Sequence, residues 1–176
     1  MIGAPRRVMA TRSLRTLRTM SDQKPPYLAG DEREVLCALL QYQRDSVVRK
    51  VEGVVDDEAR RAMVPSGTSL VWLVKHLAYA ETIWVVQRFA GEEVELPDAT
   101  VHDDDTVRAA ITLYRTTWQG VDAIVAAASL DDRCVNAANF PPLDLRWVLA
   151  HLLEETARHA GHADILRELI DGQTGR

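Results

Sequence analysis

Three side chains that could together hold a metal ion recur on two segments with helical patterning. Glu155 and His159 are four residues apart in segment 144–170, and His76 lies among apolar residues in segment 68–91. On a helix, residues i and i+4 project from neighbouring turns of one side, with Cβ atoms about 6 Å apart. Two imidazoles and one carboxylate are ligands of open catalytic zinc centres, which leave a fourth position for water or substrate. The sequence therefore indicates a candidate metal site made of His76, Glu155 and His159.

The helical face that carries Glu155 and His159 is otherwise apolar. At 100° per residue, a carboxylate and two imidazoles fall among valines and leucines, and four charged residues fall opposite. The first set is Val148, Leu152, Glu155, His159, His162, Leu166 and Leu169, and the second is Arg146, Asp164, Arg167 and Glu168. His151 lies at the edge of the apolar face. Because burying such groups without partners costs on the order of several kcal/mol each, either a metal ion or hydrogen bonds in the core must satisfy them.

Other chemical motifs are absent from the sequence or poorly placed in it. There is no glycine-rich dinucleotide or phosphate-binding loop and no Gly-x-Ser-x-Gly turn. Ser69 and His76 share a helical face, but about 10 Å separates them, which is too far for a nucleophile and its base. A di-iron centre is disfavoured because the first and third helices show no inward glutamate. Cys37 and Cys134 are too few for a disulfide scaffold, so we expect free thiols, the first as core filling and the second in a loop.

Apolar residues recur every three or four positions in four stretches, which predicts four helices and no strand. Asp31, with Glu34 three residues on, has the form of a capping box. Thr68 and Asp144 are expected to cap the second and fourth helices. The acidic run 103–105 is expected to begin the third, because carboxylates favour a helix N-terminus. The expected spans are residues 31–53, 68–91, 103–128 and 144–170. The fold class is therefore all-α, a four-helix bundle, with its aromatic residues interpreted as core packing.

The composition indicates one globular domain that follows a basic tail. The chain has 176 residues, 47% of them apolar, and a formal net charge of −5. Residues 1–19 carry five arginines and no acid, which leaves 16 basic against 26 acidic residues in the remainder. We expect residues 1–26 to be a disordered tail or an over-extended start, with a transit peptide as the alternative, and residues 27–172 to be the bundle domain.

Charge and hydropathy also restrict the partners and the location of the chain. The acidic domain disfavours a nucleic-acid partner. No apolar run approaches the roughly 20 residues that span a membrane. Free thiols and the lack of a secretory apolar core favour a cytoplasmic protein.

Two sequence segments together resemble a known family. Residues 69–77 read Ser-Leu-Val-Trp-Leu-Val-Lys-His-Leu, and residues 151–164 read His-Leu-Leu-Glu-Glu-Thr-Ala-Arg-His-Ala-Gly-His-Ala-Asp. Both resemble the DinB-like superfamily of bacterial metal-binding four-helix bundles, over about residues 27–172. The string Glu-Thr-Ala-Arg-His-x-Gly-His-x-Asp is similar to that of an actinobacterial branch of mostly uncharacterised members.

The resemblance implies a ligand set for the metal. Aligned on Gly161, it places His76 and His159 at two ligand positions and Glu155 where many members have a further histidine. This departure is similar to mycothiol-dependent maleylpyruvate isomerase, whose DinB-like domain uses His, Glu and His. That enzyme has an additional C-terminal domain at its active site, so we do not expect maleylpyruvate isomerisation itself.

The resemblance also implies a function. We expect a divalent-metal-dependent transferase or isomerase that uses a low-molecular-weight thiol, such as mycothiol, on a small electrophile, with zinc as the metal and nickel as the alternative. Zinc with two imidazoles and one carboxylate keeps a positive charge that holds a thiol as thiolate. His162 or His151 is expected to orient a ligand or move a proton. One alternative is a stress-associated bundle that forms a homodimer and binds a metal or a ligand without turnover. The other is an inert bundle whose core histidines are hydrogen-bonded.

Overall fold

Four long helices form an elongated bundle. The computed structural model describes residues 23–136 and 140–174. In chain order the elements are α1 (Glu32–Val51), α2 (Asp56–Arg60), α3 (Leu70–Glu81), the π-helix η1 (Thr82–Phe89), α4 (Val107–Ala127) and α5 (Leu145–Asp171). The described residues contain no strand beyond an isolated bridge between Arg133 and Asp144. The predicted all-α four-helix bundle is confirmed.

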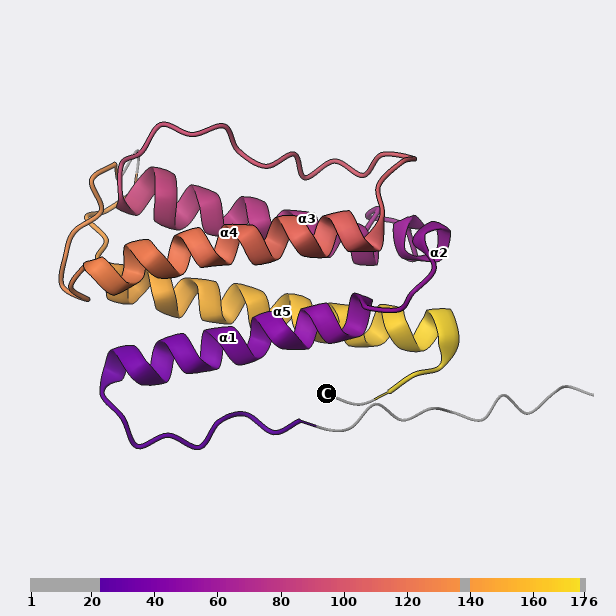
Figure 1. Ribbon diagram of the computed structural model, residues 1–176, viewed down its shortest axis with the longest axis horizontal. Coiled ribbons are helices and arrows are strands. Elements are labelled where there is room, and N and C mark those ends of the chain that lie inside the picture. The colour runs from indigo at the N-terminus through magenta and orange to yellow at the C-terminus, as the bar shows by residue number, and fades with distance from the viewer. Residues whose placement is uncertain (1–22, 137–139, 175–176) are drawn as a thin grey trace, which may run out of the picture.

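The connection 90–106 sets the helix directions. It runs back along α3 from one end of the bundle to the other, so that α4 starts beside α2 and runs in the same direction as α3 (Figure 1). The backbone N–H of Val107 accordingly donates to the carboxylate of Asp56 at 2.8 Å. Helix α5 runs against α3 and alongside α1 (Figure 1). Residues late in α3 therefore face residues early in α5.

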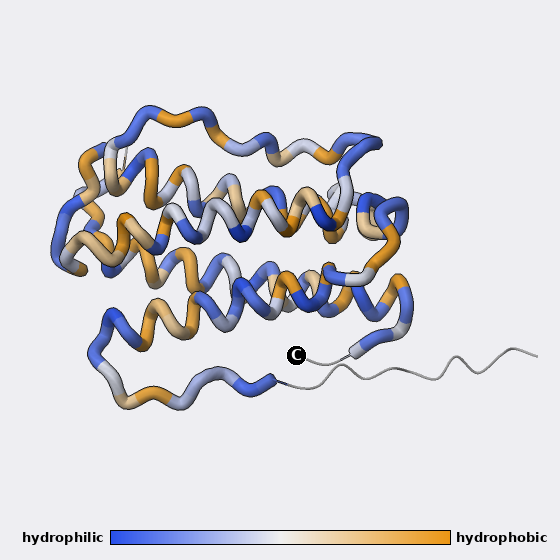
Figure 2. Tube along the Cα trace, viewed as in Figure 1, coloured by the Kyte–Doolittle hydropathy of each residue, from blue (hydrophilic) through white to orange (hydrophobic). Residues whose placement is uncertain are grey.

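The helices pack through their apolar faces. Figure 2 shows hydrophobic and hydrophilic residues interleaved along each long helix. One buried cluster includes Val47 of α1 and Leu73 of α3, and a second includes Val85 of η1 and Leu149 of α5. Burial stabilises the fold by roughly 25 cal/mol for each Å² of apolar surface removed from water. These contacts hold α3 and η1 against α5, so that His76 of α3 and Glu155 and His159 of α5 lie at the edge of the contact between the helices.

Two of the predicted helix caps are correct and one is displaced by a residue. The carboxylate of Asp31 accepts from the N–H of Glu34, and that of Asp144 from the N–H of Trp147. Helix α3 is capped by Ser69 and not by Thr68, because the Ser69 hydroxyl accepts from the N–H of Trp72 at 3.1 Å. The hydroxyl of Thr68 instead bonds that of Ser66.

The acidic run 103–105 does not begin α4, which corrects the prediction. Thr106 is the cap residue, and its hydroxyl accepts from the N–H of Ala109 at 3.1 Å. Asp105 instead joins the connection to α3, because its carboxylate accepts from the ammonium of Lys75 and from the N–H of His102, both at 2.8 Å. Lys75 is buried on α3, and a buried ammonium needs such a counter-charge.

The predicted apolar face of α5 is correct at Val148, Leu152, His159 and Leu166, which are buried, and wrong at His162 and Leu169, which are exposed. Leu169 is 59% exposed, whereas Arg167, which was expected on the charged side, is 4% exposed. The guanidinium of Arg167 donates to the carbonyl oxygens of Lys50 and Glu52, at the C-terminal end of α1. Helix C-termini leave carbonyl groups without helical partners, so a buried arginine is stabilised there.

The second predicted helix is in fact two kinds of helix. Residues 70–89 are helical as expected, and Gly91 follows with φ of 73°, but residues 82–89 are a π-helix. The N–H of Ala90 accordingly donates to the carbonyl of Val85, five residues earlier. Such wide turns are rare and are often found at functional sites. A further short helix, α2, lies where only a polar connection was expected.

A buried ion pair joins three helices in the core. Arg44 of α1 donates to both carboxylate oxygens of Glu81 at 2.9 and 2.6 Å, and to Asp122 of α4 at 2.8 Å. Arg44 and Glu81 are almost completely buried. The positive charge of Arg44 keeps Glu81 paired within the core, where an isolated carboxylate would be strongly unfavourable. The sequence pattern did not reveal this pair.

Two further expectations concern the ends of the chain and membranes. Residues 1–22, most of the expected tail 1–26, lie outside the described residues. Among the helices that are described, none has the length and apolar character required to cross a bilayer.

Candidate metal centre

The structure brings His76, Glu155 and His159 together. The Nε2 atoms of His76 and His159 each lie 3.1 Å from the same carboxylate oxygen, Oε1 of Glu155. One ligand atom from each residue lies within 4.8 Å of the other two, and this is the one such group of His, Cys, Asp or Glu in the described part of the chain. Each contact between nitrogen and oxygen requires a proton on the imidazole or a cation between the two atoms. The donor set therefore fits a divalent cation, while ligation itself stays a prediction.

The orientation of His76 is set by an aromatic neighbour. Its ring stacks on that of Trp72, one helical turn earlier, with centroids 4.7 Å apart and planes 10° apart. The same indole meets the His159 ring in a T-shaped arrangement, with centroids 6.1 Å apart. Trp72 was interpreted as core packing, but it also forms one wall of the candidate centre. The Ser69 cap fixes the first turn of α3 and so fixes this tryptophan.

The orientation of His159 is set by His162. The two Nδ1 atoms lie 3.3 Å apart, so one ring must donate to the other. If a metal took the place of the proton on Nε2 of His159, the remaining proton would be on Nδ1 and would be donated to His162. His162 is exposed and His159 is buried. Of the two candidate catalytic histidines, His162 therefore lies beside the proposed ligands.

The charge states of the centre suit a cation. Burial lowers the pKa of His159, although the nearby charge of Glu155 opposes this effect. For Glu155 burial acts to raise the pKa, but hydrogen bonds from His76 and His159 outweigh it, so the pKa is lowered overall. His159 is thus favoured as neutral and Glu155 as a carboxylate, which are the forms that bind metal.

The second oxygen of Glu155 is held from the outside. Oε2 accepts from the guanidinium of Arg158 at 3.0 Å, and Arg158 also contacts Glu154. Side-chain exposures are 25% for His76, 16% for Glu155 and 10% for His159. The group is therefore sheltered by the bundle yet open on one side, which leaves room for a ligand from solvent.

His151 occupies a separate aromatic cluster next to the centre. It lies one turn before Glu155 on α5, and its ring stacks on that of Trp147 with centroids 5.0 Å apart. The Trp84 ring meets it in a T-shaped arrangement with centroids 4.5 Å apart. Burial lowers the pKa of His151. The guanidinium of Arg88 lies over the Trp84 ring at 4.0 Å. The structure does not bring His151 into the group of ligands.

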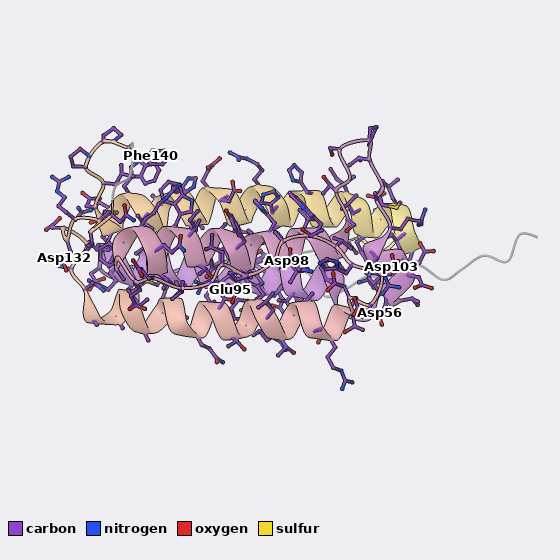
Figure 3. The ribbon with its side chains drawn as sticks, turned by 90° about the horizontal axis from the view of Figure 1, so that it is seen from above. Asp56, Glu95, Asp98, Asp103, Asp132 and Phe140 are labelled. Atoms are coloured by element: carbon purple, nitrogen blue, oxygen red, sulfur yellow. The ribbon has the colours of Figure 1, made fainter. Side chains whose placement is uncertain are left out.

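The cluster continues toward the end of the bundle where Phe140 lies. The guanidinium of Arg88 is also 4.6 Å from the Phe140 ring. In Figure 3, Phe140 and Asp132 lie at one end of the bundle, and Asp56 and Asp103 at the other. The candidate centre thus has aromatic residues on the Phe140 side along α5.

Neither cysteine takes part in the centre. Both are free and half-buried, Cys37 on α1 and Cys134 in the connection before α5. Burial raises the pKa of both thiols. Neither is therefore activated as a nucleophile, so a sulfur nucleophile in this protein would have to come from a separate small molecule.

Comparisons with known proteins give a family for the chain and a similar fold. A family model described as mycothiol-S-transferase matches residues 35–172, which include every candidate ligand and both candidate catalytic histidines. Among solved structures, a conserved protein from Enterococcus faecalis is similar, with a TM-score of 0.55 and 18% sequence identity. The match covers 82% of this chain and 99% of that one, and it supports the fold alone. No curated protein sequence matches the chain.

Proposed function

Because the chain belongs to the mycothiol-S-transferase family, and so to the DinB-like bundles that residues 69–77 and 151–164 resemble, we propose that it joins the sulfur of a mycothiol-type thiol to a small electrophile. The proposal includes a divalent cation, zinc first and nickel as the alternative, held by His76, Glu155 and His159. The observation that carries it is the convergence of these three ligand atoms within 4.8 Å at the open edge between α3 and α5.

The charge of the ligand set supports thiol chemistry. A divalent cation held by one carboxylate and two neutral imidazoles keeps a net positive charge, which favours a thiolate over a thiol whose free pKa is about 8.5. Glu155 supplies the single negative charge, and Arg158 holds its second oxygen. Trp72 keeps the ring of His76 in place by stacking. These residues bind and orient, and none of them forms a bond to the substrate.

Two histidines are candidates for handling the proton that the thiol releases. His162 is exposed beside His159 and hydrogen-bonds it, so we assign it to positioning that ligand. His151 lies one turn from Glu155, and its lowered pKa favours the neutral ring that can accept a proton. The free cysteines have raised pKa values and are not needed.

Zinc binding and thiol transfer test the proposal separately. Metal-free protein is titrated with zinc or nickel by calorimetry, and its melting temperature is followed. At a free zinc concentration 100 times Kd, selective binding stabilises the fold by about 2.7 kcal/mol. His76→Ala, Glu155→Gln and His159→Ala should each abolish stoichiometric binding. His102→Ala is the control, because His102 is exposed, pairs with Asp98 and is not part of the group of proposed ligands.

The rate of mycothiol conjugation to a chlorobimane then distinguishes an enzyme from a binding protein. We expect a zinc-dependent rate above the uncatalysed one, lost in the three ligand variants and kept in the His102 variant. Stoichiometric zinc in all three ligand variants would show that the site is wrong. Zinc binding without any rate above the uncatalysed one would favour a metal-binding bundle that does not turn over.

A further inference from the structure

A mainly apolar pocket lies beside the candidate metal centre, on the side away from the aromatic cluster. It forms where the loop between α2 and α3 meets the later turns of α5, and its volume is about 360 Å³. Ligand pockets for small molecules typically measure about 300–1,000 Å³, so this one suits a compact group. The lining residues are Val64, Ser66, Thr68, His162, Ile165 and Leu166.

His162 connects the pocket to the centre. Its side chain lines the pocket, and its Nδ1 lies 3.3 Å from Nδ1 of His159. Ile165 and Leu166 follow about one turn later on α5. A molecule in the pocket therefore lies one imidazole away from a proposed metal ligand.

The chemistry of the lining selects the kind of occupant. None of the lining residues is an acid, a lysine or an arginine, so an ionised group would gain no partner there. The hydroxyls of Ser66 and Thr68 lie 3.1 Å apart and bond each other. A sugar-linked thiol would leave many hydroxyls without partners on this surface, whereas an alkyl or aryl group would bury apolar area.

We propose that this pocket binds the apolar part of the electrophilic substrate, an alkyl or aryl group of about benzyl size. The inference rests on the proposed thiol transfer. In the probe reaction with N-benzyl-2-chloroacetamide, the thiolate sulfur forms a bond to the chlorine-bearing carbon. Chloride leaves with the electrons of the carbon–chlorine bond, and the thiol proton passes to His151 and from there to the buffer. The benzyl group lies against Ile165 and His162 while the chloroacetyl end points toward the centre.

Two surface residues of α5 give a matched pair of variants. Ile165 and Leu169 are 60% and 59% exposed, and only Ile165 lines the pocket. Ile165→Trp fills the pocket, and Leu169→Trp adds the same bulk one turn further on. Because both positions are exposed, neither change disturbs the core, and circular dichroism with thermal melting checks that both variants fold.

Binding is measured first, without any reaction. N-benzylacetamide, an unreactive analogue of the probe, is titrated into zinc-loaded protein while amide NMR shifts are followed. We expect the largest shifts at Thr68, His162 and Ile165. Ile165→Trp should weaken binding by about tenfold, the scale on which one misfitted apolar group is discriminated, and Leu169→Trp should not. Shifts elsewhere, or equal binding by the two variants, would overturn the proposal.

Conjugation of mycothiol is measured next, with N-benzyl-2-chloroacetamide and with 2-chloroacetamide, which lacks the benzyl group. Ile165→Trp should lower kcat/KM about tenfold for the benzyl substrate only. If both substrates react and the two variants behave alike, the pocket assignment is wrong while the transfer proposal stands. If the analogue binds in the pocket but neither substrate reacts above the uncatalysed rate, thiol transfer is refuted, and the substrate role of the pocket falls with it.

Discussion

Removing the hydrogen bond between His162 and His159 should weaken zinc binding without removing a ligand. His162 accepts from Nδ1 of His159 in the tautomer that leaves Nε2 for the metal. Loss of such an outer partner costs about 10–100-fold in metal affinity. Because His162 is exposed, water can take over part of its role. We therefore expect His162→Leu to raise the zinc Kd by about tenfold, which corresponds to about 1.4 kcal/mol.

Calorimetry and thermal melting measure this effect independently. At a free zinc concentration 100 times the original Kd, stabilisation should fall from about 2.7 to about 1.4 kcal/mol. For a domain of this size about 1 kcal/mol shifts Tm by roughly 2–4 °C, so the zinc-induced shift should fall from about 5–11 °C to about 3–6 °C. Zinc should still bind with a stoichiometry of one, because His76, Glu155 and His159 are intact.

A conservative variant distinguishes positioning from mere packing. The amide oxygen of Gln accepts a hydrogen bond as the imidazole of His162 does, so His162→Gln should recover most of the affinity that His162→Leu loses. His102→Leu removes an exposed histidine outside the group of proposed ligands and should leave zinc affinity unchanged. Original zinc affinity in His162→Leu would refute the tautomer argument. Equal losses in the Leu and Gln variants would refute it as well.

The buried charges and the cysteines lead to two further expectations. Glu81→Gln leaves the guanidinium of Arg44 without a full counter-charge in the core and should lower the free energy of unfolding, measured in urea, by about 3–5 kcal/mol. Asp122→Asn should lower it by about 1 kcal/mol or less, because the Asp122 side chain is 55% exposed. Similar losses in the two variants would contradict the description of Arg44 and Glu81 as a buried pair. A raised pKa means less thiolate at a given pH, so at pH 8 iodoacetamide should alkylate Cys37 and Cys134 more slowly than it alkylates free glutathione. The difference in rate should narrow as the pH rises toward about 10. Labelling of the two cysteines as fast as that of glutathione would disprove the raised pKa values.

The candidate centre could be predicted from the sequence because its signals are local. Glu155 and His159 are one helical turn apart on one face, and the apolar neighbours of His76 show which way its helix faces. The caps Asp31 and Asp144 were also local signals, since each carboxylate bonds an amide three residues on. These particular signals therefore needed no tertiary structure, whereas the equally local expectations for Thr68 and for the run 103–105 were wrong.

The features that were missed depend on contacts between distant residues. Arg167 was expected in solvent because nothing near it shows that the last carbonyls of α1 lie against it. Arg44 and Glu81, 37 residues apart, each look like surface charges until they are paired. The acidic run 103–105 resembles a helix start, yet Asp105 is required by Lys75 on another helix. The pocket likewise exists only where a loop meets α5.

The buried ion pair of Arg44 and Glu81 has a consequence for the geometry of the candidate metal centre. Glu81 and His76 lie five residues apart on α3, so any sliding of that helix moves both together. A slip of one turn, about 5.4 Å, would leave the charges of Arg44 and Glu81 unpaired in the apolar core. It would also move the imidazole of His76 away from Glu155 and His159 on α5. Arrangements of the bundle in which α3 is shifted are thus unfavourable on electrostatic grounds, even without a bound metal ion. The position of His76 relative to Glu155 and His159 therefore depends on the pair of Arg44 and Glu81, which is not part of the centre.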